Sequence, residues 1–446
     1  MDDNRKNAES KTSKYYMTLI IAASAAAMAG FFYFIFPFNI HITEEKGPVK
    51  IYFVEHIAAV HSDLIDEFNR LHKGKIEVEP LHFSLDKYTT NERKELLSRY
   101  MRGKSEKIDV LSIDIIWAPR FAKWCEPFGP NMEKLAKDSL LSYALNTCYI
   151  DGRLYAMPLH LDMGLLYYRK DILQELPDYP EIEKKLKSSI SWEELLKLQA
   201  RLKVKNPFYV FQGDNFEGLT CNYVEVMSSL YKKKPANVSI DLNSQESRQA
   251  FRHFTDLVNK YKASPKEAAD FNEISSYVYY LNNDAVFIRG WSVFRSLFEN
   301  KPEYAEKLKN IGIAALPHFE GREFASAFGG RSLMISKSST HKEEALEFIK
   351  FLISKNSQER LFEFGEFIPA NMSVYRDTAF MAKNPDLRYY SSFFTRGVYR
   401  PKQEDYTRVS DITAYYLNAA IKGTMTVDEA ITKGGNMIRS GSILIY

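Results

Sequence analysis

An apolar stretch near the N-terminus constrains this chain more than any other feature of its sequence. No charged side chain occurs between Tyr15 and Thr43, and the 22 residues Met17–Phe38 are almost wholly apolar. As a helix they would be roughly 33 Å long at 1.5 Å per residue, which matches the hydrocarbon thickness of a bilayer. The stretch therefore predicts one helix that either crosses a membrane or directs export, and the rest of the chain must fold separately from it.

The charges on either side of this stretch predict its orientation. Lysines and arginines precede it and Glu44-Glu45 follow it, so the N-terminus is expected in the cytoplasm. We expect a cytoplasmic tail at 1–16, a transmembrane anchor or uncleaved signal at 17–40 and a leash at 41–47. Cleavage as a signal peptide is the alternative, because Ala25–Ala27 offer small residues to a peptidase, although the apolar stretch is longer than a usual signal core. Both interpretations place the C-terminal bulk in the periplasm or outside the cell.

Composition excludes several classes of protein. A length of 446 residues suits two or three domains, and a formal net charge of +3 does not indicate a nucleic-acid partner. No CxxC, HExxH, GxGxxG or complete phosphate-loop motif occurs, so neither a metal nor another cofactor is expected. The three cysteines allow a Cys125–Cys148 disulfide after export, or three buried free thiols.

Strand and helix patterns alternate in the first part of the exported chain and return late. Lys50–Val54, Ile76–Pro80 and Val110–Ile113 resemble buried strands with helical patterns between them, which favours a mainly parallel sheet. After a long helical block from Trp192, strand-like runs recur at Asp284–Ile288 and Leu333–Ser336. This order suits two lobes that share the chain, with a cleft for a ligand where the backbone crosses between them.

Several segments resemble the sugar-binding proteins of bacterial ATP-driven importers. They occur in one order between Lys50 and Ile438, and they are Asp109–Trp117, Trp124–Pro127, Asp151–Pro158, Asp162–Asp171, Phe216–Cys221, Asp284–Trp291, Gly329-Gly330 and Glu343–Leu352. The resemblance is to family-1 extracellular solute-binding proteins, in particular the trehalose- and maltose-binding branch. It implies an α/β, two-lobed periplasmic-binding-protein-like fold of type II, with each lobe a mainly parallel sheet flanked by helices. The implied lobes are 48–159 plus 331–370, and 160–330 plus 371–446.

Two aspartates are candidates to bind sugar hydroxyls. Asp114 directly follows an apolar strand, and Asp162 lies between two strand-like runs at the proposed hinge. A carboxylate accepts hydrogen bonds that are stronger than those between neutral groups. For Asp114 the alternative is a helix N-cap.

Two tryptophans are candidates for stacking against a pyranose ring. Trp117 and Trp291 are two of only four in the chain, and Trp291 occupies a position where the resembled family carries a stacking indole. Core packing is the alternative for both. We leave Trp124 and Trp192 as core residues.

The resemblance also implicates charged residues and a glycine pair. Glu217 is a candidate hydroxyl acceptor or a helix-start acid, and Arg93 and Arg400 match positions that reach ligand hydroxyls. Gly330 is followed by Arg331 where the family usually has Trp, and His160 replaces a common Tyr. A guanidinium grips carboxylates or phosphates, so these departures favour an altered or anionic sugar as the ligand.

The resemblance implies a binding protein rather than an enzyme. It would close on a carbohydrate and deliver it to the transmembrane subunits of an ABC permease, with the N-terminal helix holding it at the membrane. One alternative is an anchored extracellular glycosidase that uses Asp114 and Asp162 as its carboxylate pair. The other is a sensor subunit that presents its ligand to a signalling partner.

Overall fold

The computed structural model describes residues 3–35, 47–83, 90–103, 108–202, 206–232 and 238–444. The chain divides into two compact units, 1–47 and 48–446, which are treated separately below. The predicted leash lies outside the described residues except for Gly47.

The first unit contains one long helix, α1 (Asp3–Ile35). Within the described residues, the 18-residue stretch Lys14–Phe31 of α1 is the one that is long and apolar enough to cross a membrane. A signal sequence near the N-terminus meets the same criteria. The structure therefore agrees with the predicted helix and leaves both interpretations of it open.

The second unit is built on one mixed sheet of eleven strands and a separate two-stranded hairpin. The strands are β1 (Val49–Glu55), β2 (Ile76–His82), β3 (Val110–Asp114), β4 (Cys125–Glu126), β5 (Tyr149–Ile150), β6 (Arg153–Leu154), β7 (Met157–Arg169), β8 (Tyr209–Val210), β9 (Phe287–Trp291), β10 (Ile311–Ala314), β11 (Ser326–Ser336), β12 (Ile368–Pro369) and β13 (Gly397–Val398). The main path through the sheet is β2-β1-β3-β11-β7-β9-β8.

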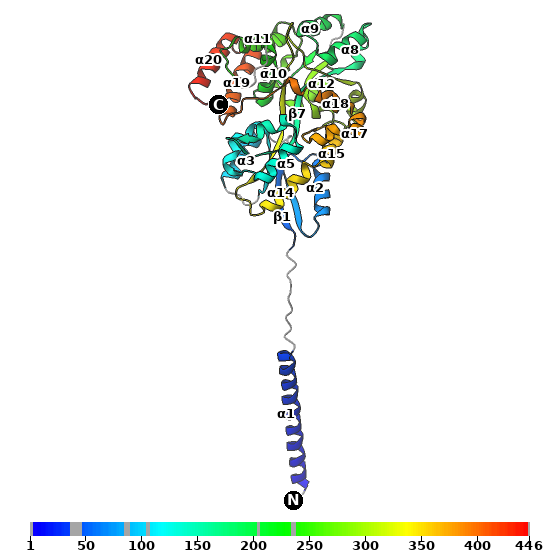
Figure 1. Ribbon diagram of the computed structural model, residues 1–446, viewed down its shortest axis with the longest axis vertical. Coiled ribbons are helices and arrows are strands. Elements are labelled where there is room, and N and C mark those ends of the chain that lie inside the picture. The colour runs from blue at the N-terminus through cyan, green and yellow to red at the C-terminus, as the bar shows by residue number, and fades with distance from the viewer. Residues whose placement is uncertain are drawn as a thin grey trace. The chain divides into compact units, whose positions relative to one another are not determined.

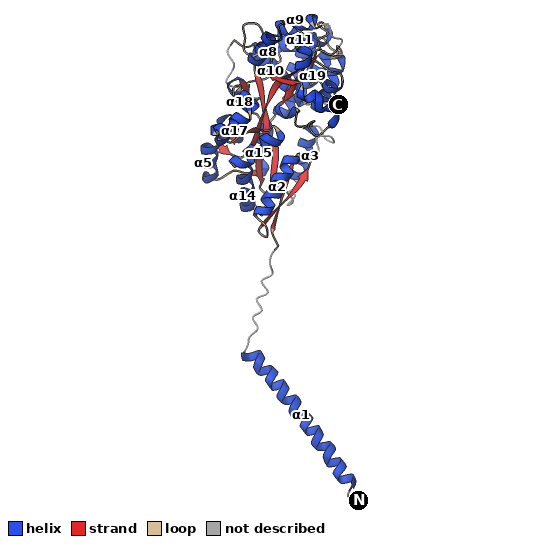
Figure 2. Cartoon of the chain, turned by 90° about the vertical axis from the view of Figure 1, so that its right-hand side faces the viewer, coloured by secondary structure: helices blue, strands red, loops and turns tan. Residues whose placement is uncertain are grey.

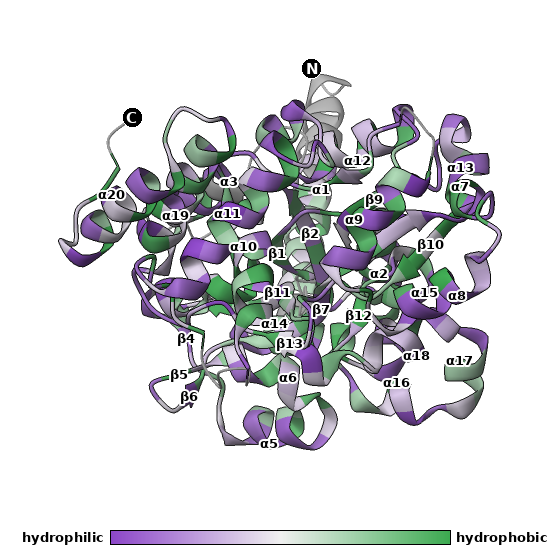
Figure 3. Ribbon diagram, turned by 90° about the horizontal axis from the view of Figure 1, so that it is seen from above, coloured by the Kyte–Doolittle hydropathy of each residue, from purple (hydrophilic) through white to green (hydrophobic). Residues whose placement is uncertain are grey.

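Helices flank this sheet on its faces (Figure 2). They are α2 (Ala59–Leu71), α3 (Thr90–Arg102), α4 (Ala118–Phe121), α5 (Pro130–Ser139), α6 (Ser142–Leu145), α7 (Lys170–Leu173), α8 (Tyr179–Ser188), α9 (Trp192–Arg201), α10 (Glu217–Leu230), α11 (Gln245–Asn259), α12 (Glu273–Asn282), α13 (Ala305–Lys309), α14 (Lys342–Leu352), α15 (Lys355–Gly365), α16 (Met372–Arg376), α17 (Thr378–Lys383), α18 (Pro385–Ser391), α19 (Tyr406–Ile421) and α20 (Val427–Arg439). Peripheral helices such as α5 and α20 carry hydrophilic segments, whereas the central strands β1 and β11 are largely hydrophobic (Figure 3).

The described hydrophobic residues form two cores, and two long strands run through both. One core gathers around β1, β2, β3, α2 and α14, and the other around β9, β10, α10, α11 and α19. In Figure 1, β1, α2 and α14 lie in one lobe, and α10, α11 and α19 lie in the other. β7 passes from the first core at Leu159 to the second at Leu161, and β11 passes from the second at Phe328 to the first at Leu333. The two-lobed α/β fold is thus confirmed, while the residue boundaries predicted for the lobes remain a prediction.

Strand pairing differs between the two cores. β1 pairs parallel with β2 and β3, as expected from the strand–helix alternation. In the second core β7 pairs antiparallel with β9 and β10, and the parallel pairs involve only the short strands β8, beside β9, and β13, beside β11. In the first core β11 also pairs antiparallel with β3. The expectation of mainly parallel sheets was therefore wrong for the second core and for β11 in the first, because β7 and β11 pass from one core to the other as shared strands and not through strand–helix crossovers.

The crossing point depends on a glycine in β11. Gly330 has φ +121°, and a Cβ there would lie 2.3 Å from the carbonyl oxygen of His160 on β7. The register of the two strands also shifts between Arg331 and Ser332. Only glycine meets both the backbone angle and the close approach, so this residue fixes how β11 crosses β7.

Candidate functional site

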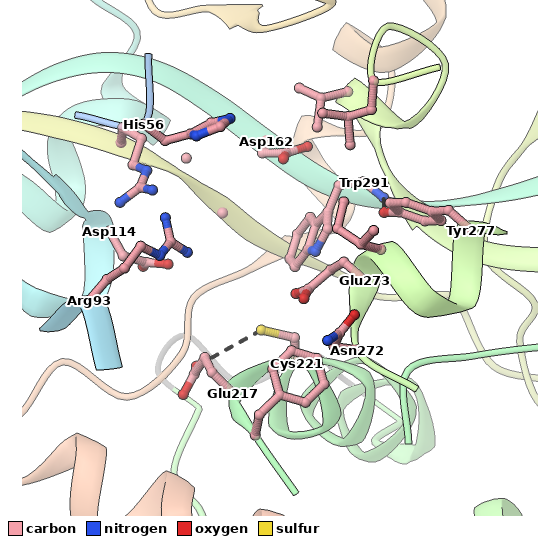
Figure 4. A pocket seen from close by; sticks show the side chains of 18 of the residues that line it. His56, Arg93, Asp114, Asp162, Glu217, Cys221, Asn272, Glu273, Tyr277 and Trp291 are labelled. Atoms are coloured by element: carbon pink, nitrogen blue, oxygen red, sulfur yellow. Dashed lines mark hydrogen bonds between the residues drawn. The ribbon is translucent and has the colours of Figure 1, made fainter. Parts of the chain in front are cut away.

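A cavity of about 720 Å³ lies at the crossing strands. Nine of the ten residues predicted from the sequence line it, and they are Arg93, Asp114, His160, Asp162, Glu217, Trp291, Gly330, Arg331 and Arg400. His56, Arg93 and Asp114 lie on one side of the space, and Glu217, Asn272, Glu273 and Trp291 on the other (Figure 4). The cavity is therefore lined from both cores.

Trp117 is the predicted residue that does not line this cavity. It is buried in the first core, and its ring lies 6.3 Å from that of Phe121. The alternative of core packing describes its position. Trp192, left as a core residue, is also buried.

Arg400 joins two of the predicted carboxylates across the cavity. Its Nη2 donates to Asp114 Oδ1 at 2.8 Å, and its Nη1 donates to Glu217 Oε1 at 2.7 Å. Asp114 stands at the end of β3 in the first core, whereas Glu217 begins α10 in the second. Arg400 is buried, and the neighbouring Asp114 and Glu217 raise its pKa well above the ordinary value despite the opposing effect of burial. These three residues, predicted to reach a ligand separately, thus form one ionic link between the two cores.

Both carboxylates of this link have structural contacts as well. Asp114 Oδ1 accepts from the backbone N–H of Ile116, so it caps the short helical turn that follows β3. Glu217 accepts from Tyr406 Oη at 2.7 Å and from Ser410 Oγ at 2.5 Å. Asp114 is therefore a helix cap and Glu217 a helix-start acid, as the alternative interpretations of the sequence expected. Both residues also line the cavity.

Asp162 is held on one side and lines the cavity at the middle of β7. Its Oδ1 accepts from the backbone N–H of Ser292 at 2.9 Å, from Ser292 Oγ at 2.8 Å and from the N–H of Met163 at 2.8 Å. Burial raises its pKa to about 6, although the bonds from Ser292 oppose the change. Asp162 therefore ties β7 to the residue after β9.

The histidines of the cavity are neutral. Burial lowers the pKa of His56 and of His160 to about 3, and it also lowers that of His61. His160 Nδ1 lies 3.2 Å from the carbonyl oxygen of Leu161, and since that oxygen only accepts, Nδ1 carries the proton. Conversely, His61 Nδ1 accepts from the N–H of Ala58, so the proton of His61 is on Nε2.

Several buried polar atoms of residues that line the cavity have no hydrogen-bond partner among the described residues. They include Nδ1 of His56, Nε2 of His61 and Oε2 of Glu55. These atoms are buried, so a ligand can bond to them only after their side chains turn toward the cavity. Leaving a donor such as His61 Nε2 and an acceptor such as Glu55 Oε2 unpaired is unfavourable, which favours a group that both donates and accepts.

Arg331 has a charge partner within the protein. Its Nε lies 3.6 Å from Oε1 of the buried Glu55. The sequence favoured an anionic ligand for the Arg331 guanidinium. In the structure this guanidinium faces a carboxylate of the protein that already balances its charge.

The sequence did not single out several lining residues of the second core. Asp214 and Asn215 precede α10, and Asn272 and Glu273 stand at the start of α12. Asn272 caps α12, because its side chain accepts from the N–H of Ser275 at 2.9 Å. Burial raises the pKa of Glu273. The sequence signal at these residues was an Asn-Glu pair before a helical pattern, and such a pair predicts the start of a helix and not a binding cavity.

Among the residues that the structure describes, neither the cysteines nor the titratable clusters form a metal or disulfide site. Within the described ranges, no group of three or more His, Cys, Asp or Glu could hold a metal ion. Cys125, Cys148 and Cys221 are separate, buried thiols, so the proposed Cys125–Cys148 disulfide does not form in this structure. Burial raises the pKa of Cys148 to about 11.

Known proteins resemble the chain in sequence and in structure. The family model for bacterial extracellular solute-binding proteins matches residues 63–388. A probable ABC transporter-binding protein of Deinococcus radiodurans is 27% identical over 331 residues, which are 72% of this chain and 76% of that protein. An arabinooligosaccharide-binding protein of Halalkalibacterium halodurans is 21% identical over 344 residues, which are 75% and 74% of the two chains. The structure of maltose-bound MalE3 of T. maritima has a TM-score of 0.77 and 27% identity, over 88% of this chain and 99% of that one.

Proposed function

We propose a function for this chain from the family to which it belongs, that of the bacterial extracellular solute-binding proteins. The chain is the solute-binding component of an ABC importer, and its ligand is a sugar bound in the cavity between the two cores. One observation carries this proposal. Carboxylates from both cores line a single cavity at the crossing strands, together with the Trp291 indole and side chains that have unpaired polar atoms. Its volume falls within the range of small-molecule sites.

The unpaired atoms of the cavity favour hydroxyl groups as the ligand's chemistry. A hydroxyl donates and accepts at once, so it can pair with Glu55 Oε2 or with the N–H at His61 Nε2 once that side chain turns toward the cavity. Trp291, half-buried at the end of β9, offers an apolar surface to the C–H face of a sugar ring. Maltose in MalE3 and the arabinooligosaccharides named for the relative from Halalkalibacterium halodurans are ligands of this chemistry.

The internal ion pairs favour an uncharged sugar over an anionic one. Arg400 is paired with Asp114 and Glu217, and Arg331 faces Glu55. An anionic ligand would have to displace these carboxylates or remain unpaired itself, and either outcome is unfavourable in a buried site. We therefore propose a neutral di- or oligosaccharide in place of the anionic sugar expected from Arg331 alone.

Hinge closure is the proposed mechanism. β7 and β11 connect the two cores, and their crossing at Gly330 is the place where a relative rotation of the lobes would be absorbed. A sugar bonded from both cores stabilises the closed form and shifts the population toward it. Micromolar affinity would correspond to about −8 kcal/mol.

Delivery completes the proposed function. The closed form would dock on the transmembrane subunits of a permease and release the sugar unchanged. If α1 is retained as a single-pass anchor, it confines the protein to the membrane plane and raises its effective concentration near the permease.

A glycosidase remains the second candidate because of Asp162. A pKa of about 6 is typical of a carboxyl group that acts as a general acid, and Asp114 lies in the same cavity. Against this activity, Asp162 Oδ1 accepts three hydrogen bonds from Ser292 and Met163, which account for its position structurally. Release of reducing sugar from maltose or arabinooligosaccharides would favour the enzyme, and the binding proposal expects none.

A thermal-shift screen tests the proposal. The full chain in detergent is heated with neutral mono- and disaccharides, arabinooligosaccharides, uronates and sugar phosphates. A neutral sugar at a hundred times its dissociation constant is expected to stabilise the protein by about 2.7 kcal/mol. Stabilisation by uronates or sugar phosphates alone would contradict the neutral-sugar proposal, and stabilisation by none would contradict sugar binding.

A further inference from the structure

Two tyrosines from other elements of the fold hydrogen-bond the backbone of Trp291. Its N–H donates to Tyr277 Oη at 3.0 Å, and its carbonyl oxygen accepts from Tyr167 Oη at 2.8 Å. Both tyrosines are fully buried, Tyr167 on β7 and Tyr277 on α12. The end of β9 is therefore bonded from two other elements at the one residue whose indole lines the cavity.

A buried ion pair lies behind the indole ring. The guanidinium carbon of Arg289 is 3.9 Å from the centroid of the Trp291 ring. Glu225 on α10 holds this guanidinium with two bonds, from Nε to Oε2 at 3.1 Å and from Nη2 to Oε1 at 2.7 Å. The side chains of Arg289 and Glu225 are 1% and 5% exposed, so water screens the pair little.

The same pair is joined to both long strands. Glu225 Oε1 also accepts from the N–H of Ala327 on β11 at 3.1 Å. On β7, a Cβ at Gly164 would lie 1.9 Å from Glu225 Oε1 and 2.8 Å from Arg289 Nη2, so only glycine leaves room for the pair. A Cβ at Gly329 on β11 would lie 3.1 Å from the edge of the Trp291 ring. The pair and the ring therefore pack directly against the strands that cross between the cores.

Stability alone does not account for a buried pair in this place. Apolar residues of similar volume often stabilise a core as well as a buried ion pair does, because both charges lose their hydration. A guanidinium held by two hydrogen bonds offers a fixed plane against which an indole can stack, and an apolar side chain offers no such plane. A guanidinium held in this way is therefore suited to keep a stacked indole in one orientation.

We propose that Glu225 and Arg289 are positioning residues that hold the Trp291 indole in one orientation as the stacking surface for the ligand. This inference deepens the proposed function and rests on it for the identity of the ligand as a sugar. A ring that is already oriented loses less side-chain freedom when a ligand binds, so the pair raises affinity without touching the ligand.

The first test needs no sugar. The full chain is labelled with 5-fluorotryptophan, and the 19F resonance of Trp291 is assigned by its loss in W291F. R289M is expected to shift and broaden this resonance while those of Trp117 and Trp124 stay in place. R169M is the matched control, because Arg169 is also buried and paired, with Asp171 and Asp284, but lies away from Trp291. An unchanged Trp291 resonance in R289M, or an equal change in R169M, would overturn the proposal.

Further variants guard against misfolding. E225Q keeps the volume of the side chain but removes the two-point bond, so it is expected to reproduce the R289M spectrum. R289K keeps the charge without the plane and is expected to restore the wild-type line shape only in part. Full restoration by R289K would show that charge and not stacking matters, and would count against the proposal.

The second test uses maltose as the probe in a double-mutant cycle. R289M is expected to weaken maltose binding about tenfold in the wild-type background, which is 1.4 kcal/mol, and to have no further effect in W291A. An equal loss in both backgrounds would mean that Arg289 does not act through Trp291. If the wild type binds neither maltose nor any sugar of the screen, the proposed function fails, and the 19F spectra still decide whether the pair positions the ring.

Discussion

At the scale of residues, the charged side chains of the cavity are occupied mainly with one another. Arg400 is shared by Asp114 and Glu217, Arg331 faces Glu55, and Asp162 accepts three bonds from neighbouring backbone and side-chain groups. These residues offer a ligand a set of fixed dipoles, because most of their charges are already ion-paired or hydrogen-bonded within the protein. Such a site suits a neutral molecule that forms many directional hydrogen bonds.

Asp162 makes the stability of the protein depend on pH. Its pKa is raised from 3.8 to about 6 in the folded chain, so the folded state binds the proton more tightly than the unfolded state. Its contribution is therefore fully present below pH 3.8 and is lost as pH rises through about 6. Relative to D162N, the wild type is expected to lose about 2–3 kcal/mol of unfolding free energy between pH 4 and pH 7.

Urea unfolding of both proteins across this pH range checks the expectation. Asn at 162 keeps an acceptor for Ser292 and does not titrate, so it is the appropriate reference. A difference between the two proteins that is constant with pH would show that Asp162 has an ordinary pKa.

Arg400 should be the most sensitive charged residue of the cavity. R400M leaves the carboxylates of Asp114 and Glu217 without their shared cation, and removing one partner of a buried ionic link typically destabilises by about 3–5 kcal/mol. The midpoint of urea unfolding measures this loss. The control R201M breaks the exposed pair with Asp178 and is expected to change stability by at most about 1 kcal/mol. Equal effects of the two variants would contradict the account of the link.

The sequence predicted part of this site for a physical reason. Asp114 and Trp291 each end an apolar strand, and the ends of strands meet at the cleft of such a fold, so their position along the chain was informative. Glu55 ends the apolar strand β1 in the same way but was not predicted as a ligand, and neither was His61 on α2, because no sequence pattern shows which buried polar atoms will lack a partner. Trp117 was predicted as a ligand residue but lies in the first core, since the sequence does not distinguish an indole that packs in a core from one that stacks on a ligand.

At the scale of elements, the apolar patterns predicted the major helices and strands closely, and the shared strands less well. β1, β2 and β3 lie within two residues of their expected ranges, and α9 begins at Trp192, where the helical block was expected to begin. β7 and β11 are much longer than the short runs recognised, because they are buried over almost their whole length and show no alternation. Short helices such as α16, α17 and α18 were missed, since each has fewer than two helical turns to show a period.

The crossing of β7 and β11 can be tested at Gly330. G330A forces φ +121° on a residue with a Cβ and brings that atom against the carbonyl of His160, so a loss of at least about 2 kcal/mol is expected. G129A is the control, because Gly129 has φ −74° and a Cβ there meets nothing within 4 Å. Thermal unfolding of both variants measures the difference, and a G330A melting curve identical to that of G129A would contradict the role of this glycine.

At the scale of the whole molecule, the two cores of residues 48–446 are separate hydrophobic units joined by long strands. The cavity lies where those strands cross, and both cores line it. Sequence patterns predicted this arrangement because strands that recur after a helical block require the chain to return to a sheet it has left. They could not predict the ion pairs that span the cavity, which depend on the packing of residues separated by more than 180 positions.

Isothermal titration calorimetry of the full chain with neutral di- and oligosaccharides tests the central claim most directly. The account predicts that at least one of them, with maltose and arabinooligosaccharides tried first, binds one molecule per chain with micromolar affinity. It also predicts that W291A weakens this binding at least tenfold, while W117F leaves it unchanged. Absence of binding heat for every neutral sugar, with a protein that still unfolds cooperatively, would contradict the account, as would equal affinities of W291A and the wild type.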